Sequence, residues 1–298
     1  MFQFLLYCIL LMGSYLFSTE QEGHIYPGKE YIFLNDPIDV VIPCIEEDLD
    51  TLELCIAGIR NNCTQIKTIF VVSQKRLSHN AEWIPESIYP FDKKDIALAL
   101  FDGERSPLDY ETAIEYIAYP KNRLGWLYQQ LIKLYTPLII PKISSNVLML
   151  DADTVFLNPV TFTDEQGAAC FNVGSEYHKP YFAHMRRLLP NLHKVYPAYS
   201  GVSHHMLFQK CVLLDLKSHI ETYHQQPMWK ALIQCIDHNE LAFSSMSEYE
   251  IYFNFALQRS NQFTIRPLIW DKTPTLNRFE YFKQMGYHYV SAHRWYRE

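Results

Sequence analysis

The sequence predicts an α/β protein with a mostly parallel sheet flanked by helices. Apolar runs with many β-branched residues, which are typical of buried strands, recur at residues 39–44, 66–73, 96–101 and 146–150. Stretches with the periodicity of amphipathic helices separate several of these runs. Such an alternation is typical of parallel strands joined by helices. The 298 residues, of which 48% are hydrophobic, suffice for one large domain, which we place at residues 36–298.

Two helices are expected in the first half of the chain. In the segment 46–61, leucine and isoleucine recur at spacings of three and four residues, which predicts one apolar helical face. In the segment 123–136, four leucines line one helical face. We expect Pro137 to end this helix, because proline cannot donate a backbone hydrogen bond. The strand at 146–150 then follows.

The second half of the chain is less regular. Short strands are expected at residues 167–173, 203–209, 263–268 and 287–293. Helices are expected at residues 228–237 and 247–257. We interpret this half as an elaboration of the sheet that the first half builds.

An apolar run at residues 2–17 precedes a polar stretch and resembles the hydrophobic region of a secretory signal peptide. We interpret residues 1–22 as a signal peptide or a hydrophobic anchor, with a strand or helix of the fold as the alternative. No Lys or Arg precedes the run, and its end is a poor cleavage site. This interpretation predicts a secretory or exported protein, which is associated with a membrane where the leader is retained.

The charge distribution argues against a nucleic-acid partner. The formal net charge is −7, and the basic runs do not exceed the pairs Lys93-Lys94 and Arg186-Arg187. An acidic protein that holds a polyanion needs a metal ion or a few well-placed cations. Six of the seven cysteines lie outside the leader, and none forms a Cys-x-x-Cys pattern, so we do not expect zinc. Their disulfide pairing is left open, and buried free thiols are the simplest interpretation.

The most informative motif is the pair Asp151 and Asp153, which directly follows the apolar run 146–150. In extended backbone, residues two apart project to the same side, so both carboxylates are expected to face one point at the end of a strand. Two oxygen ligands of this kind suit Mg²⁺ or Mn²⁺. The alternative is that one aspartate caps the following turn and the other is solvated.

The stretch 147–157, VLMLDADTVFL, resembles the Asp-x-Asp strand of GT-A nucleotide-sugar glycosyltransferases. The chain also resembles an uncharacterised bacterial family of that superfamily over about residues 38–297, through the stretches RLGWLYQQ, SHHMLF and SEYE at 123–130, 203–208 and 247–250. The resemblance implies a GT-A, Rossmann-like fold whose C-terminal half serves the acceptor. It also implies metal-dependent, hexosyltransferase-like transfer from a nucleotide-diphosphate sugar to an unknown glycan, lipid or protein.

By the same resemblance, Asp151 and Asp153 hold Mn²⁺ or Mg²⁺ on the donor diphosphate. In family 8 glycosyltransferases a late histidine joins the two aspartates on the metal, and His293 is the match here. The glycine-lysine-proline-tryptophan context of that histidine is absent from this chain. The alternative for His293 is a ring packed among its aromatic neighbours, and His288 is a weaker candidate.

Four residues are candidates for substrate binding. Arg123 resembles a cation near the donor phosphates, since a guanidinium donates two parallel hydrogen bonds, although a surface ion pair is the alternative. Gln130, two turns further along the same helix, is a candidate for contact with donor or acceptor. Pro43 follows the first strand, where GT-A folds begin their nucleotide pocket. Asp102 follows the predicted strand at 96–101 and is a candidate for a ribose contact, with an Asp-Gly turn as the alternative.

Two residues are candidates for the reaction chemistry. Adjacent strand residues point to opposite faces, so only one of His204 and His205 is expected to face a given pocket, and we favour His205. Glu248 is the candidate base on an acceptor hydroxyl in an inverting reaction, or a stabilising carboxylate in a retaining one. Its neighbour Glu250 is explained by a capping box with Ser247.

Two other functions share parts of this pattern. Phosphatases of the haloacid dehalogenase type also use Asp-x-Asp-x-Thr after a strand, with the first aspartate, here Asp151, as nucleophile. Their motif normally opens the catalytic domain, whereas about 110 residues of βαβ pattern precede it here, and no matching acidic pair follows. The other alternative is a protein of the same fold that binds sugar or nucleotide sugar without catalysis.

Overall fold

A computed structural model describes residues 25–273 and 275–293. Its central sheet has five strands in the order β3-β2-β1-β4-β7. The first four run parallel, and β7 is antiparallel to β4. The strands are β1 (Ile38–Pro43), β2 (Ile66–Ser73), β3 (Glu82–Pro85), β4 (Asn146–Leu150) and β7 (His205–Gln209). The order β3-β2-β1-β4 is that of a Rossmann-like sheet, so the predicted fold class, a mostly parallel α/β sheet flanked by helices, is confirmed.

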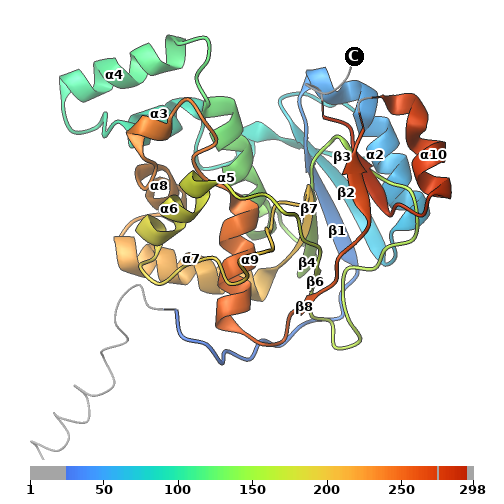
Figure 1. Ribbon diagram of the computed structural model, residues 1–298. Coiled ribbons are helices and arrows are strands. Elements are labelled where there is room, and N and C mark those ends of the chain that lie inside the picture. The colour runs from blue at the N-terminus through green and yellow to red at the C-terminus, as the bar shows by residue number, and fades with distance from the viewer. Residues whose placement is uncertain (1–24, 274, 294–298) are drawn as a thin grey trace, which may run out of the picture.

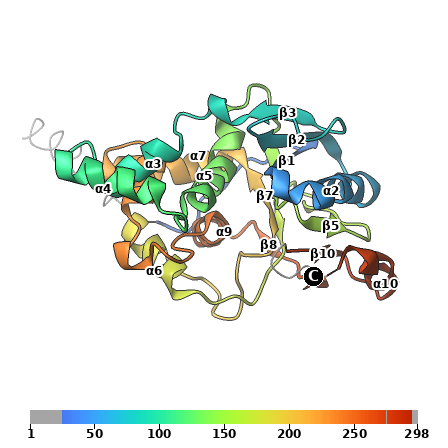
Figure 2. The same ribbon diagram turned by 90° about the horizontal axis from the view of Figure 1, so that it is seen from above.

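Helices cover both faces of this sheet (Figures 1 and 2). α5 (Leu124–Ile139), α7 (Lys210–His224) and α9 (Glu248–Arg259) pack on one another and cover one face, whereas α2 (Leu49–Asn62) lies on the other. The remaining helices are α3 (Lys93–Leu100), α4 (Pro107–Ala118), α6 (Lys179–Leu188), α8 (Met228–Gln234) and α10 (Phe279–Gln284). Single 3-10 turns occur at Glu46–Asp48, Glu86–Ile88, His238–Glu240 and Leu276–Arg278.

Two small sheets extend the second half. β5 (Thr154–Phe156) pairs antiparallel with β10 (Tyr289–Ser291), which pairs parallel with β9 (Trp270–Lys272). β6 (Cys170–Phe171) pairs with β8 (Thr264–Ile265). Because β5 starts four residues after β4 ends, this arrangement brings the C-terminal strand β10 beside the carboxyl end of the central sheet. The elaborated C-terminal half that the sequence predicts has this form.

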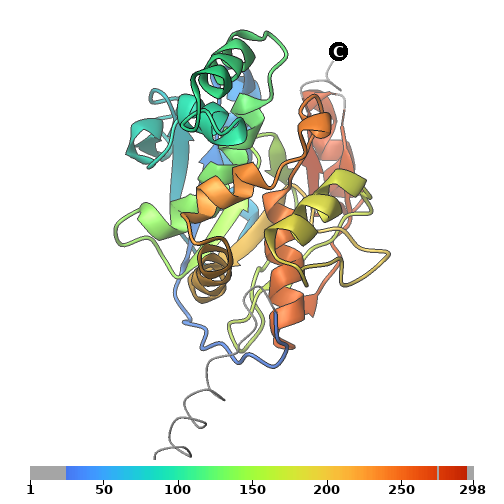
Figure 3. The same cartoon turned by 90° about the vertical axis from the view of Figure 1, so that its left-hand side faces the viewer.

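The core follows from the sequence runs that predicted the strands. Every residue of β1 and of β4 is buried, as expected for central parallel strands covered on both faces. The apolar side of α5 packs near β1, and α2 packs against β2 and β5. Figures 1 and 3 show the segment that precedes β1 at one end of the molecule and the protruding α4 at the other.

Two expectations about elements were wrong. Residues 96–101, predicted as a strand, form most of α3, whose N-terminus is fixed by a capping box between Asp92 and Asp95. The buried residues of this short apolar run also fit one helical face, an ambiguity that periodicity cannot resolve over six residues. α5 also continues past Pro137 to Ile139, since this proline lies in the last turn and the amide of Ile140 still bonds to the carbonyl of Thr136.

The other predicted elements occur, some of them shortened: the predicted strand at 167–173 is reduced to the two residues of β6. The predicted leader at 1–22 lies outside the described residues. Within the described part of the chain, no helix is both long and apolar enough to span a membrane. The six cysteines outside the leader are free thiols.

Candidate functional site

Asp151 and Asp153 lie where the central sheet meets the small sheet of β5, β10 and β9. Asp151 follows the last residue of β4, and its amide bonds to the carbonyl of His204 at 3.0 Å. The amide of Thr154 bonds back to the carbonyl of Asp151, which closes a tight turn and starts β5. The backbone carbonyl of Asp153 accepts from the amide of Ala292 at 2.8 Å. Both aspartates therefore occupy the carboxyl end of a central parallel strand, where α/β folds place their ligands.

The Asp151 carboxylate is shared between a lysine and a histidine. Its Oδ1 lies 2.5 Å from Nζ of Lys133, and its Oδ2 lies 3.3 Å from Nδ1 of His204. The hydroxyl of Tyr249 donates to Oδ1 at 3.5 Å. Burial raises the pKa of Asp151, but the Lys133 ammonium and the hydrogen bond with His204 outweigh burial and hold this pKa below its usual range. Asp151 is therefore an ionised, anchored carboxylate.

The Asp153 carboxylate is held by the C-terminal strand. Nδ1 of His293 lies 2.8 Å from its Oδ2, and the hydroxyl of Ser291 donates to its Oδ1 at 3.2 Å. The pairing of Ser291 with Thr154 in the β5–β10 ladder fixes this approach. The structure thus brings together Asp153 and His293, which are 140 positions apart.

The histidine at the site is His204, and the preference for His205 was wrong. His204 has a positive φ of 64°, which is uncommon for a residue other than glycine and turns its side chain toward Asp151 just before β7 begins. Its ring lies 4.6 Å from the ring of His293 and 5.1 Å from that of Trp270, between centroids. Only one ring of the pair faces the site, as expected, but at this left-handed residue it is the ring of His204.

His205 instead points into the core. Its ring packs edge-on against Phe156, Phe162 and Tyr289. Burial, and after it the neighbouring His204, lowers the pKa of His205 to about 3. This side chain is a neutral packing group rather than a catalytic one.

A buried polar cluster connects α5, β4 and α9. Lys133 and Glu248 are 2% and 1% exposed, and Lys133 Nζ lies 2.7 Å from Oε1 of Glu248. The ammonium also lies 4.3 Å from the centre of the Tyr249 ring. Burial lowers the pKa of Lys133, but Asp151 and Glu248 outweigh it and raise this pKa above its ordinary value. The amide of Glu248 bonds to Oε1 of Gln130 at 3.4 Å, so the predicted Gln130 and Glu248 are both in this cluster.

Sequence reasoning missed Lys133, although a signal was present. Lys133 is the one charged residue of the sixteen-residue helix α5, and leucine and isoleucine flank it. A lone charge on a helix this apolar indicates a buried partner of opposite charge. The positive φ of His204 has no comparable signal in the sequence.

The other predicted substrate residues make no hydrogen bond or ion pair with this cluster in the described part of the chain. Arg123 is the N-cap residue of α5, where it donates to Ser244 and lies over the ring of Trp126. Its Nε is buried with no hydrogen-bond partner among the described residues. Pro43 ends β1 at the same edge of the sheet as Asp151.

Asp102 does not follow a strand, as was expected, but follows α3, with a positive φ of 52°. Its carboxylate accepts from Gln234 at 2.8 Å and lies 3.3 Å from Arg105. These contacts belong to the α3–α8 region. The Asp-Gly turn is the better interpretation of this position.

The donor set at the site fits a divalent cation in ligand type and charge. Two carboxylate–imidazole pairs, Asp151 with His204 and Asp153 with His293, are adjacent, because the two histidine rings contact each other. The 3.3 and 2.8 Å contacts within the pairs each join a carboxylate oxygen to a ring nitrogen as a hydrogen bond, which a bound cation would have to replace. Three carboxylates (Asp151, Asp153 and Glu248) and one ammonium (Lys133) leave a charge of −2 when the histidines are neutral.

No three His, Cys, Asp or Glu side chains in the described part of the chain already converge as metal ligands do. Binding of one divalent cation would therefore require the side chains of both pairs to move toward the same point.

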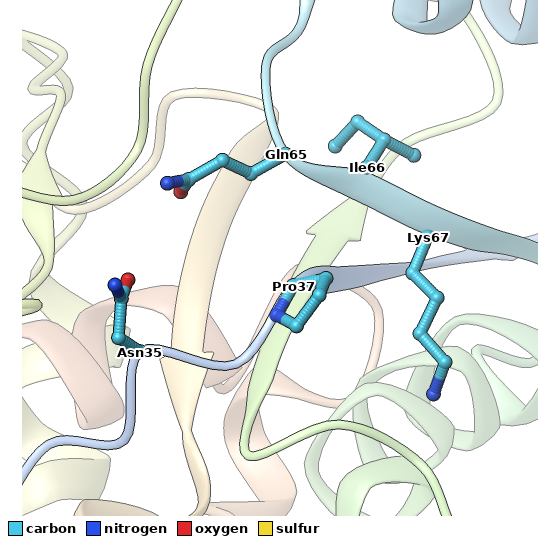
Figure 4. Close-up of a pocket in the computed structure, with 5 residues that line it drawn as sticks. All are labelled: Asn35, Pro37, Gln65, Ile66 and Lys67. Carbon is cyan, nitrogen blue, oxygen red and sulfur yellow. The ribbon is translucent and has the colours of Figure 1, made fainter.

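A shallow open pocket lies at the opposite edge of the sheet (Figure 4). It is lined by residues before and at the amino ends of β1 and β2: Asn35, Pro37, Gln65, Ile66 and Lys67. Because β1, β2 and β4 are parallel, this edge is remote from the carboxyl end that carries Asp151. It is not part of the candidate site.

Two solved structures are similar to this chain at low identity. Mouse xyloside xylosyltransferase 1, in its apo form, is 10% identical with a TM-score of 0.38, and the match covers 87% of this chain and 98% of that one. The apo structure of WbbM, a bifunctional glycosyltransferase, is 10% identical with a TM-score of 0.43, and the match covers 90% of this chain and 47% of that one. Both TM-scores are too low for either likeness to assign an activity.

Among curated proteins, none matches this chain by sequence. The family described as being of unknown function, DUF6492, matches residues 67–289. This range is well over half of the chain and contains Lys133, Asp151, Asp153, His204 and Glu248. The chain therefore belongs to the family of unknown function DUF6492.

Proposed function

We propose that this protein is a metal-dependent glycosyltransferase, which transfers a sugar from a nucleotide-diphosphate sugar to an acceptor. Asp151 and Asp153 would hold Mn²⁺ or Mg²⁺, with His293 as a third ligand. The observation that carries the proposal is the meeting of Asp153 with His293 at the carboxyl end of β4, beside the anchored Asp151. The resemblance of residues 147–157 to a GT-A Asp-x-Asp strand supports the same reading.

Transfer of the sugar requires that the negative charge on the leaving group be stabilised. A bound divalent cation would supply it for the departing nucleoside diphosphate, without a proton transfer. The chain's own residues would orient the donor: the two carboxylates face the edge of the sheet where nucleotides bind in such folds. Ser291 and His204 hold the two carboxylates in fixed orientations. Trp270 stacks on Tyr289 and contacts His204, so aromatic side chains border one side of the site.

The partners that we propose are a nucleotide-sugar donor and an acceptor that is a glycan, a lipid or a protein. Nucleic acid is not proposed, given the net charge of −7. A secretory or exported location, with membrane association through an N-terminal leader at residues 1–22, remains our proposal from the sequence.

The test is a panel of nucleotide sugars with Mn²⁺ or Mg²⁺, in which release of nucleoside diphosphate is followed. We expect at least one donor to be turned over by the wild type. Asp153→Ala should lose at least about a hundredfold in rate, since stabilisation of a developing charge is worth about 3 kcal/mol or more. The matched control is Glu165→Ala, which removes an exposed carboxylate in the loop before β6 and should retain the wild-type rate.

The panel also separates the alternatives. Metal-dependent donor binding without turnover, on any acceptor, would indicate a non-catalytic sugar-binding protein. Phosphate release with a transient phosphoryl group on Asp151 would indicate a phosphatase. An unaffected Asp153→Ala variant would overturn the proposed metal role.

A further inference from the structure

The buried ammonium of Lys133 occupies one oxygen of the proposed cation ligand Asp151. Its Nζ lies 2.5 Å from Asp151 Oδ1 and 2.7 Å from Glu248 Oε1. We propose that Lys133 is a built-in counter-ion, which keeps the site folded without a cation and weakens its affinity for a free divalent cation. This inference rests on the proposed function.

The ammonium group of Lys133 is buried and is shielded from solvent. Lys133 is 2% exposed and projects from the middle of α5, so its charge depends on the two carboxylates and the Tyr249 ring for stabilisation. Conversely, Asp151 and Glu248 would be two carboxylates facing each other without it. Removal of the ammonium leaves uncompensated buried charge, which is among the more destabilising changes a protein core can undergo.

Glu248 acts in this arrangement as the second counter-charge. It is the first residue of α9, where a helix N-terminus favours a negative side chain, and Ser247 caps the same helix. Its carboxylate is bound to Lys133, and the residue is 1% exposed. We therefore assign Glu248 to the support of Lys133 and not to the reaction with an acceptor, which would need an accessible carboxylate.

The consequence for the cation follows from charge. A divalent cation at Asp151 would lie within a few ångströms of the ammonium, and like charges repel strongly where water is excluded. The carboxylates alone would then bind a free cation weakly. A nucleoside diphosphate adds phosphate oxygens and negative charge, so cation and diphosphate should bind as one unit.

The test measures Mn²⁺ affinity by electron paramagnetic resonance, with Mn²⁺ alone and with Mn²⁺ plus a nucleoside diphosphate. Lys133→Gln keeps a group that can hydrogen-bond to Asp151 but removes the charge. We expect this variant to bind free Mn²⁺ at least about ten times more tightly than the wild type, because a divalent and a unit charge about 5 Å apart repel by this much even at the dielectric constant of water, and by more in a partly buried site. Its melting temperature should be lower than that of the wild type without Mn²⁺ and should rise on addition of Mn²⁺.

The matched control is Lys67→Gln. Lys67 also pairs with a buried aspartate, since its Nζ lies 3.8 Å from Asp39, which is 1% exposed, but this pair lies at the opposite edge of the sheet. Its substitution should leave Mn²⁺ affinity unchanged. If Lys133→Gln does not fold, the double variant Lys133→Met with Glu248→Gln removes one charge of each sign and takes its place, again with tighter Mn²⁺ binding expected.

The outcomes separate this inference from the proposed function. A wild type that binds Mn²⁺ and a Lys133→Gln variant that binds it no more tightly would overturn the inference alone. If neither protein binds Mn²⁺, with or without diphosphate, the proposed cation-dependent function is wrong and the inference falls with it.

Discussion

Gly58 allows α2 to pack closely against β5, the strand that follows the aspartate pair. A Cβ atom at this position would lie 2.8 Å from the carbonyl oxygen and 2.9 Å from the amide nitrogen of Phe156 in β5. Both are backbone atoms, so a rotamer change cannot relieve the contact. We predict that Gly58→Ala forces α2 and β5 apart by about 0.6 Å, since an ordinary contact of a Cβ atom is 3.4 Å or longer.

The expected cost follows from two opposing effects. Overpacking of this kind costs about 2–3 kcal/mol, whereas alanine in a helix interior gains about 1 kcal/mol over glycine. The net loss is about 1–2 kcal/mol, which lowers the melting temperature of a chain of this size by about 2–4 °C. Because β5 carries the ladder to β10, the variant should also bind Mn²⁺ more weakly.

The control is another helical glycine. Gly125 in α5 has no atom within 4 Å of a built Cβ, so Gly125→Ala should raise the melting temperature by about 1–2 °C. Thermal melts followed by circular dichroism would measure both variants. If Gly58→Ala melts at or above the wild-type temperature while Gly125→Ala behaves as expected, the close approach of α2 to β5 is wrong.

Two further predictions concern stability. Burial lowers the pKa of His205 to about 3 and that of His184 to about 4. Above a pH of about 6.5 both histidines are neutral in the folded and in the unfolded chain, so they do not reduce the free energy of unfolding. As the pH falls below this value, the unfolded chain takes up protons that the folded chain does not, and the free energy of unfolding decreases. A shift to pH 5 should lower the free energy of unfolding by about 2 kcal/mol for each histidine. The melting temperature of His205→Phe should therefore change less between pH 7.5 and 5 than that of the wild type. An equal change in both proteins would refute the neutral, buried state of His205. Ser247→Ala removes the hydroxyl that accepts from the amide of Glu250 and should cost about 1 kcal/mol in the free energy of urea unfolding, whereas no change in the midpoint would show that the cap does not matter.

The sequence was most informative where an apolar run was compatible with only one type of secondary structure. The runs at 66–73 and 146–150 have the bounds of β2 and β4. β4 is buried throughout and is apolar after Asn146, whereas β2 is buried mainly in its second half. The aspartates after β4 then had to lie at the carboxyl edge. The run at 96–101 failed because a six-residue apolar stretch fits a helix or a strand equally, and the capping signal at Asp92 decided for the helix.

The site was predictable only in part. Asp151 and Asp153 follow from their strand, and His293 was placed by resemblance to other sequences. The choice of His205 over His204 was wrong, because the positive φ of His204 before β7, which the sequence does not signal, turns the ring of His204 toward Asp151. Lys133 was missed although its place as the lone charge on an apolar helix signals a buried partner, because its two partners, Asp151 and Glu248, come from different parts of the chain and the sequence does not identify them.

The most direct measurement is a calorimetric titration of a nucleoside diphosphate into the wild type and Asp153→Asn, with and without Mn²⁺. We predict that the wild type binds at least ten times more tightly when Mn²⁺ is present, and that Asp153→Asn, which keeps its shape but loses its charge, shows no such gain. Binding that is the same with and without Mn²⁺, or a gain that Asp153→Asn retains, would contradict the proposal that the aspartate pair holds a cation on a diphosphate.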